Sequence, residues 1–447
     1  MNKNKIVFLI IGIIIVVFLV SIFLLLSKTG EVNKNKNASK TGDFTIWILQ
    51  DSKDGFNNFL NDFKSKNPNY KNTNFNIVSF SNYEEYYNTL ISSFLQGNSP
   101  DIFLINNQDS EIFDKQISGI DPSVISPDDF RKNYDIVFSN DLIKKTKVDD
   151  KEVEFLIGVP MGYENLGLFY NFRDVKGKNL STWANINEIV TNLRNDSGKI
   201  TIGIGNGSTV DSSSDIITQF LMLEGPSSLE KITSKDAKSA ISSYVRYGDE
   251  NLDNKYDTLF SDLVANNKNN LDAFSAGDVQ IIIGYPRLLD KIEKKGFSKT
   301  FLRASTFPTL KENSGNILVN YNTFVINKNT TNYQTAQDLM KYFSSVEGQK
   351  KYLEIFNYYM PTQLSLISDR LEENIKDGYN IKYKDFYNPS LQLTTFNKGI
   401  KNIYDQEVPN MLDHLTNGVK LFEKFQKKVL CIKQKSIKQE NLQNSCE

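Results

Sequence analysis

Short, almost wholly apolar runs alternate along the chain with stretches in which apolar residues recur every third or fourth position. The run at 44–49 is typical of a parallel strand that is covered on both faces. The next stretch, which ends before Pro68, has the spacing of a helix that buries one face. Its apolar positions are Phe56, Phe59, Leu60 and Phe63. A second strand is predicted at 75–80, so the body of the chain opens with a β-α-β unit.

The same alternation continues through most of the chain. A stripe of aromatic and aliphatic residues predicts a helix over 83–95 that is capped by Gly97, and we expect this stripe to lie in the core. Further strands are expected at 101–105, 200–204, 279–283 and 317–327. Further helices are expected at 182–193, 215–223 and 335–343, with amphipathic segments near the C-terminus. The pattern indicates an α/β fold, and 447 residues are enough for two to three domains.

The stretch 152–172 differs from the others because it contains two apolar runs and no loop between them. We interpret it as a strand, a break marked by Pro160 and a second strand that crosses between two lobes. Glu164 is left at the junction, where a carboxylate is costly to bury without a hydrogen-bonding partner. A bound ligand is one candidate for this partner, and the backbone or a lysine is the alternative.

The longest apolar run, Ile6–Leu26, is long enough to span a bilayer as a helix. It is followed by Ser27 and Lys28 and has no small-residue cleavage site, which favours an uncleaved anchor over a removed signal peptide. We expect 1–27 to be the membrane anchor or signal, 28–42 to be a flexible linker, and the body to lie on the extracytoplasmic side. The sequence therefore predicts a single-pass membrane protein.

Composition excludes several classes of function. The net charge is −1 and the sequence pI is about 6.1, so no broad basic surface is available for nucleic acid. With one histidine, His414, and two cysteines, the chain has few residues for metal sites or for histidine-based catalysis. We therefore expect no metal, no cofactor and no enzymatic activity. Cys431 and Cys446 form either a disulfide or two free thiols.

Several short motifs occur in an order that matches a known family. They are Gly97-Asn-Ser-Pro-Asp101, Val159-Pro160 with Leu168-Phe-Tyr-Asn171, Thr182-Trp183, Phe274–Asp278, Phe307-Pro308, and Thr335-Ala336 with Ser345–Gln349. On these motifs, residues 43–428 resemble the extracellular solute-binding proteins of ABC importers, in the sugar-type family 1 related to the maltose-binding protein. The number and order of the motifs carry the resemblance, since each motif alone is short.

The resemblance implies a two-lobe periplasmic-binding-protein-like fold of type II, with a ligand cleft and about three hinge crossings. Lobe one would comprise 43–163 and 321–360, lobe two 164–320 and 361–428, and a polar tail 429–447. The expected function is to capture a carbohydrate or oligosaccharide in the cleft and to deliver it to the permease of an ABC importer. The protein would act as a monomer, and closure of the lobes around the solute would signal that the binder is loaded.

The resemblance also nominates ligand-binding residues. They are Gln50, Asp51, Lys53, Asn106, Asn107, Gln108, Glu164, Ser208, Thr209, Asp211, Tyr285, Arg287, Tyr321, Asn322 and Phe396. Amides and carboxylates suit sugar hydroxyls because they donate and accept in fixed geometry, while Tyr285 and Phe396 would stack on a sugar ring. The alternative roles are a turn or helix cap for each Asn, Asp or Ser, and a core position for Phe396.

Other functions stay open on the residues alone. The body has only Trp47 and Trp183, whereas sugar binders of this family carry several cleft tryptophans, so a peptide or a polyol is an alternative solute. A sensory ectodomain with the same fold is a second alternative. A hydrolase would pair Glu164 with Asp51 or Asp211, but nothing in the sequence sets the separation of these carboxylates.

Overall fold

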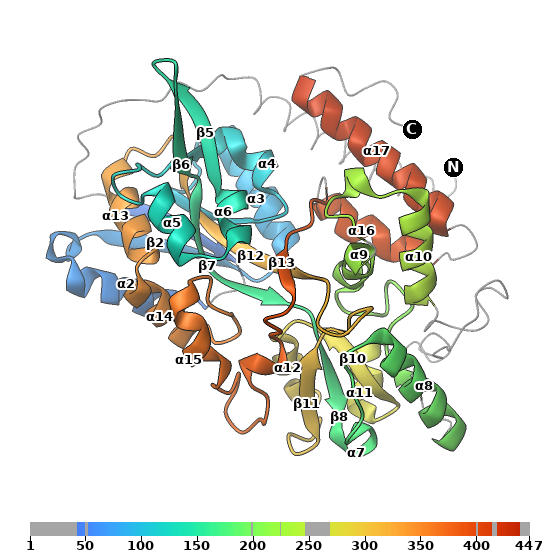
Figure 1. Ribbon diagram of the computed structural model, residues 1–447. Coiled ribbons are helices and arrows are strands. Elements are labelled where there is room, and N and C mark those ends of the chain that lie inside the picture. Colours follow the sequence, from blue (N-terminus) through green and yellow to red (C-terminus); the bar gives the residue numbers. More distant parts are fainter. Residues whose placement is uncertain are drawn as a thin grey trace, which may run out of the picture.

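The computed structural model describes residues 43–49, 52–197, 200–223, 225–245, 269–398, 401–413 and 418–438. Two sheets lie in different parts of the molecule (Figure 1). The large sheet has the strand order β13-β12-β3-β1-β2, and β4 and β7 also pair with β12. Its strands are β1 (Asp43–Leu49), β2 (Asn74–Phe80), β3 (Ile102–Asn106), β4 (Ile117–Ser118), β7 (Gly158–Asn165), β12 (Asn316–Asn327) and β13 (Gln392–Thr394).

The predicted opening β-α-β unit is confirmed, because β1 pairs in parallel with both β2 and β3. The connecting helices are α2 (Lys53–Lys66) and α3 (Tyr83–Gln96). Ser52 and Asn82 cap them by accepting backbone N–H groups of the first turn. α3 ends at Gly97 with φ of 73°, a conformation that suits glycine because it has no Cβ. The apolar stripe of α2 and most of that of α3 are buried, as expected, whereas Leu95 at the end of α3 is 43% exposed.

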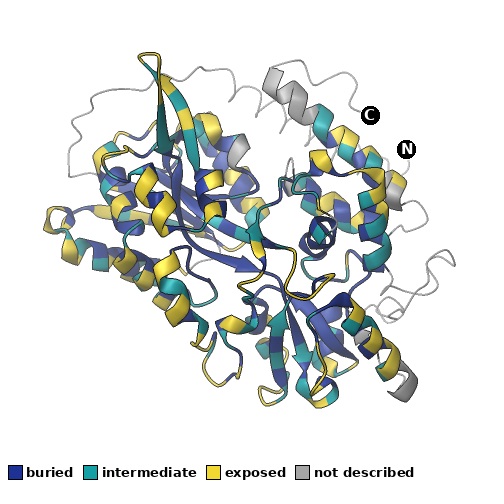
Figure 2. Ribbon diagram, in the orientation of Figure 1, coloured by how far each residue is buried: buried dark blue, intermediate teal, exposed yellow. Residues whose placement is uncertain are grey.

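Other elements complete the large-sheet half of the molecule. The helices are α4 (Ser110–Phe113), α5 (Pro127–Asn133), α6 (Ile136–Leu142), α13 (Tyr333–Phe343), α14 (Val346–Ile355) and α15 (Ile367–Leu371). An antiparallel hairpin is formed by β5 (Ile143–Val148) and β6 (Lys151–Leu156). The hairpin projects from the body and has an exposed tip, whereas the strands of both sheets are mostly buried (Figures 1 and 2).

The small-sheet half has the strand order β11-β8-β10-β9. Its strands are β8 (Gly167–Asn171), β9 (Ile200–Ile202), β10 (Val279–Gly284) and β11 (Leu302–Thr306). Its helices are α7 (Phe172–Val175), α8 (Trp183–Ser197), α9 (Ser213–Leu223), α10 (Ser234–Val245), α11 (Asn270–Ala276), α12 (Leu288–Lys294), α16 (Lys401–Leu412) and α17 (Gly418–Lys438). Most predicted strands and helices therefore lie within a few residues of their expected positions.

Three segments connect the two halves. β7 of the large sheet continues into β8 of the small sheet through Leu166 alone. β12 is the second segment, and the third runs between β13 of the large sheet and α16 of the small-sheet half. Beside the first segment, Tyr163 of β7 and Met360 exchange two backbone hydrogen bonds. The predicted break at Pro160 is wrong, because this residue lies inside β7. The pairing of β7 with β12 shifts register between Pro160 and Tyr163, where two residues of β7 face one of β12, and Gln349 and Thr362 both donate to the carbonyl oxygen of Pro160.

Two clusters of buried side chains form the core. One includes the large sheet and extends onto one face of the small sheet, and the other lies between the opposite face of the small sheet and the helices α9, α10, α16 and α17. Trp47 and Trp183 each belong to a core cluster. Ile112 of α4 and Leu393 of β13 pack against both clusters, so the two halves are in direct apolar contact at these positions.

The ends of the chain differ in how far they can be described. The predicted anchor and linker, 1–42, lie outside the described residues, and no helix within the described part is long and apolar enough to cross a membrane. At the other end α17 continues to Lys438, and Val429 is fully buried, so the packed body extends beyond the expected end at 428. Cys431 on α17 is disulfide-bonded, while Cys446 lies outside the described residues.

Candidate functional site

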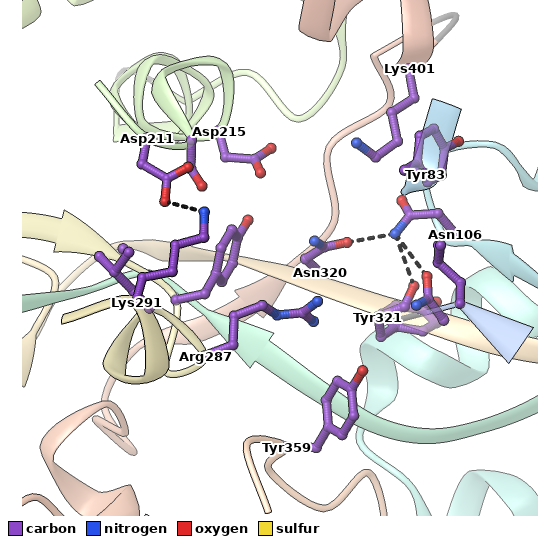
Figure 3. A pocket seen from close by; sticks show the side chains of 16 residues that line it. Tyr83, Asn106, Asp211, Asp215, Arg287, Lys291, Asn320, Tyr321, Tyr359 and Lys401 are labelled. Atoms are coloured by element: carbon purple, nitrogen blue, oxygen red, sulfur yellow. Dashed lines mark hydrogen bonds and ion pairs between the residues drawn. The ribbon is translucent and has the colours of Figure 1, made fainter. Parts of the chain in front are cut away.

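A cavity of about 290 Å³ lies between the large sheet and the small sheet (Figure 3). It opens at the carboxyl ends of β1, β3 and β10, where the strand order of α/β sheets leaves a crevice for ligands. The lining residues are Leu49, Tyr83, Asn106, Asp211, Ser212, Asp215, Gly284, Tyr285, Arg287, Leu288, Lys291, Asn320, Tyr321, Asn322, Tyr359 and Lys401. Both halves of the molecule contribute side chains, so a bound solute would contact both.

A cluster of three amides forms the wall on the large-sheet side. β3 ends at Asn106, which lies opposite Asn322 in the antiparallel pairing with β12. The Nδ2 of Asn106 donates to Asn320 Oδ1 at 2.6 Å and to Asn322 Oδ1 at 3.2 Å (Figure 3). The Oδ1 of Asn106 accepts from the backbone N–H of Gln108 at 3.1 Å. This network holds the amide planes in place and presents polar edges to the cavity.

An ion pair between a buried carboxylate and a partly exposed arginine supports the floor of the cavity. Arg287 follows β10 and donates through Nε to Glu164 Oε2 at 2.6 Å, and its Nη2 contacts the same carboxylate oxygen. Its backbone N–H is 3.4 Å from Glu164 Oε1. Glu164 is 1% exposed and does not line the cavity, whereas Arg287 does. The guanidinium lies 5.7 Å from the ring centre of Tyr359, so the ion pair and this ring together position the arginine.

Four tyrosines bring aromatic surface to the cavity: Tyr83, Tyr285, Tyr321 and Tyr359. Tyr321 donates its hydroxyl to Asp141 Oδ2 at 2.7 Å, so the hydroxyl of Tyr321 is fixed by a carboxylate of the large-sheet half. Burial raises the pKa of Tyr321 and Tyr285 well above the ordinary value, and the neighbouring carboxylates Asp141 and Asp215 raise it further. Tyr321 and Tyr285 therefore remain neutral at physiological pH, and all four rings offer apolar faces with polar edges.

The charged side chains of the cavity are arranged in pairs. Lys291 donates to Asp211 Oδ2 at 2.8 Å (Figure 3). Lys401 pairs with Asp405, and Asp215 accepts from Lys398 at 2.6 Å. With the Arg287 pair included, each charged residue of the lining has a partner of opposite sign. The site therefore has almost no net charge to attract an ionic solute.

The sequence-predicted site residues separate into three groups. Six of them line the cavity: Asn106, Asp211, Tyr285, Arg287, Tyr321 and Asn322. Others lie near it, since Asn107 and Gln108 follow Asn106, Glu164 supports Arg287, and Ser208 and Thr209 line an adjoining hollow with Asp211. Lys53 is exposed on α2 and is not part of the lining, while Gln50 and Asp51 lie outside the described residues.

Phe396 requires a correction. It is 1% exposed and packs in the second core cluster, with its ring 6.4 Å from that of Tyr404. A fully buried ring has no face available for a sugar, so its role is to anchor the segment before α16. Its apolar character is compatible with both roles, and only its packing partners separate them.

Sequence reasoning missed several lining residues, among them Tyr83, Asp215, Lys291, Asn320, Tyr359 and Lys401. Tyr83 was assigned to an apolar stripe, although it stands at the first position of α3, where a side chain can face the end of the sheet. Asp215 and Lys291 each lie in the first turn of the helix that follows a predicted strand, α9 and α12 respectively. The sequence signal for these lining residues was therefore the first turn of each helix that follows a strand, and not only the loop between them.

Among the described residues, no group of three or more His, Cys, Asp or Glu side chains is placed to hold a metal ion.

Comparison with known proteins agrees with this architecture. The family described as bacterial extracellular solute-binding protein matches residues 58–376. A search of curated proteins finds no match. The sugar-binding protein MalE of Xanthomonas citri superposes with a TM-score of 0.65 at 14% identity, covering 90% of this chain and 100% of that chain.

Two further solved structures have the same fold. An ABC substrate-binding protein of Listeria monocytogenes in complex with cycloalternan gives a TM-score of 0.62 at 14% identity, covering 90% of this chain and 100% of that chain. The maltotriose-binding protein of Thermus thermophilus bound with maltotriose gives a TM-score of 0.57 at 15% identity, covering 88% of this chain and 99% of that chain. At these identities the likeness establishes a fold like that of the maltose-binding proteins. Because the family match spans more than half of the chain, the protein belongs to the bacterial extracellular solute-binding proteins.

Proposed function

We propose that this protein captures a neutral carbohydrate in the cavity between its two halves and delivers it to an ABC importer. The observation that carries the proposal is the composition of the cavity, in which amides and tyrosine rings converge and every charge of the lining is paired. Amide groups match sugar hydroxyls, and tyrosine rings match the apolar faces of sugar rings. An ionic solute would instead bring an unpaired charge into this site.

The solved structures with the same fold support the choice of solute. They include complexes with cycloalternan, maltose, maltotriose, acarbose and tagatose. The cavity volume of about 290 Å³ lies at the small end of the usual range for ligand sites. We therefore infer a monosaccharide or disaccharide and not a long glucan.

The wider assignment is part of the same proposal. The body acts outside the cytoplasm, as the family implies, and we propose that residues 1–27 anchor it to the membrane through the linker 28–42. The lobes would comprise 43–163 with 321–360, and 164–320 with 361–428. The solute would then be released unchanged to the permease, with no chemical step on the protein.

A thermal-shift screen tests the solute class. The full chain is titrated with maltose, maltotriose, D-tagatose, a mixture of amino acids and a tripeptide. A solute that binds only the folded state raises the melting temperature as its concentration exceeds the dissociation constant. A shift with a sugar and none with amino acids or the tripeptide supports the proposal, whereas the reverse result contradicts it. Chromatography of the recovered sugar checks that it has not been cleaved.

Replacing Asn106 by Ala in the same assay tests the amide cluster. This change removes the donor that joins Asn320 and Asn322, so we expect the dissociation constant for the sugar with the largest shift to rise about tenfold. Asn98→Ala is the matched control, because Asn98 is exposed at the end of α3 and lies away from the cavity. Equal affinities of the two variants in titration calorimetry would remove the amide cluster from the binding site.

A further inference from the structure

A buried chain of alternating charges runs through the small-sheet half to the edge of the cavity. Lys398 is fully buried and donates to Asp215 Oδ1 at 2.6 Å and to Asp405 Oδ1 at 2.5 Å. Asp405 also pairs with Lys401, one helical turn away in α16. The ammonium of Lys401 is therefore held in one place at the point where α16 begins and the cavity ends.

The large-sheet half meets this ammonium with an aromatic ring. Lys401 Nζ lies 4.8 Å from the ring centre of Tyr83 at the start of α3, and Figure 3 shows the two side chains together at one side of the cavity. The ring of Tyr83 stacks on Tyr87 at 5.9 Å, and its hydroxyl donates to Asp109 Oδ2. The ring is thus fixed on its own half and presents its face to the lysine of the other half.

Asp109 completes the contact. It is 1% exposed, and it follows β3 directly after the amide of Asn106 and its neighbours. Ile112, one turn later in α4, packs against both core clusters. Polar and apolar contacts between the halves therefore coincide at α4 and α16.

We propose that Lys401, Tyr83 and Asp109, here called the cross-half link, hold the two halves closed over the cavity and thereby strengthen solute binding. The inference rests on the proposed function, because it assumes that the halves open and close around a solute. A contact that stabilises the closed form in the absence of solute reduces the conformational cost that the solute must overcome. Lys401 thus acts as a positioning residue in addition to lining the cavity.

The test measures closure without any solute. Spin labels are attached to Lys132→Cys on α5 and Lys294→Cys on α12, two exposed positions in different halves, in a full chain that carries Cys431→Ser and Cys446→Ser. Pulsed dipolar spectroscopy then gives the distribution of distances between the halves. We expect a short component, from the closed form, alongside a longer one. The failure of every sugar to bind would refute the proposed function and leave this measurement intact.

Replacing Lys401 by Met removes the cation and keeps the length of the side chain. We expect the ratio of closed to open molecules to fall about fivefold, which is the effect of losing one partly buried cation–π contact. Lys401→Arg keeps the cation and should restore the ratio. Lys295→Met is the matched control, because it breaks a 2.6 Å pair with Asp272 inside the small-sheet half and should leave the distances unchanged.

Tyr83→Leu removes the aromatic partner of Lys401 on the large-sheet half. This variant replaces Lys401→Met in the test if Lys401→Met does not fold. It should also shift the distances towards the open form. Unchanged distances in both variants would overturn the proposal, even if their melting temperatures fall, because this would show a purely structural role. A wild-type distribution with no short component would overturn it as well. Failure of Lys401→Arg to restore the ratio would refute the assignment of the effect to the charge.

Discussion

Glu164 shows how the role of a single residue depends on its partners. Its carboxylate lies at the junction between the two halves, where an unpaired charge would be costly. The structure supplies the partner from another part of the chain, since three donors of Arg287 reach the two carboxylate oxygens. Glu164 therefore positions Arg287, and the arginine is the residue that a solute would meet.

Glu164→Gln tests this relation. The neutral amide accepts a weaker hydrogen bond and cannot neutralise the guanidinium, so Arg287 should lose its fixed orientation against Tyr359. We expect the affinity for the sugar identified by thermal shift to fall about tenfold, measured by titration calorimetry. Glu312→Gln, at an exposed carboxylate that accepts from Asn179 and Ser181, is the control for the same chemical change. An affinity equal to that of the control would show that the pair has no part in binding.

Among the elements, the loop before α9 lies in close contact with the helix α16 and with the residue that follows it. The backbone N–H groups of Gly207 and Ser208 donate to the carboxylate of Asp413 at 2.7 and 3.0 Å. A Cβ built on Gly207 would lie 1.8 Å from the carbonyl oxygen of Pro409 in α16. Only glycine therefore allows the loop to approach this helix, and the approach places Asp211 at the cavity.

Gly207→Ala should force the loop and α16 apart. We expect a loss of about 2 kcal/mol in the free energy of unfolding, as for other substitutions that overpack a tight contact. Urea denaturation measures the loss, and hydrogen exchange should become faster in α16 and stay unchanged in α2. Ser208→Ala, at the exposed neighbouring position, should leave both observables close to wild type. Protection of α16 that survives in Gly207→Ala would contradict the contact.

For the whole molecule, the contact between the halves makes stability depend on pH. Burial raises the pKa of Asp109 from the ordinary 3.8 to about 7, although the nearby Lys401 and Lys398 lower it. Asp405, also nearby, raises it, and Tyr83 donates to the same carboxylate. The folded protein thus binds a proton that the unfolded chain has released. Such a group destabilises the fold increasingly as pH rises from about 4 to about 7.

Asp109→Asn should remove this dependence. We expect the free energy of unfolding of the wild type, relative to Asp109→Asn, to fall between pH 4 and pH 7.5 by an amount on the order of 2–4 kcal/mol. Urea denaturation of both chains across this range measures the difference. Well below pH 3.8, the ordinary pKa of an aspartic acid, the two curves should run parallel, because Asp109 is then protonated in both states. A difference that is constant throughout the range would show that the carboxyl of Asp109 titrates as in the unfolded chain.

The sequence by itself determined the elements and the family. Apolar runs and helical spacing are local properties, so the strands of the β-α-β unit, the cap at Gly97 and the strand that delivers Arg287 could be located without a structure. The order of short motifs was sufficient to predict the solute-binding family, which the family match confirms.

Only the tertiary structure decided which polar residues face the cavity. Residues such as Glu164 and Arg287, or Lys401 and Tyr83, are more than a hundred positions apart in the chain, and no local pattern encodes their contact. For the same reason the sequence could not show that Phe396 is buried, or that Pro160 lies inside a strand, next to a register shift in the pairing with β12. Burial and partner choice are collective properties of packing, and they assign one of several chemically suitable roles to each side chain.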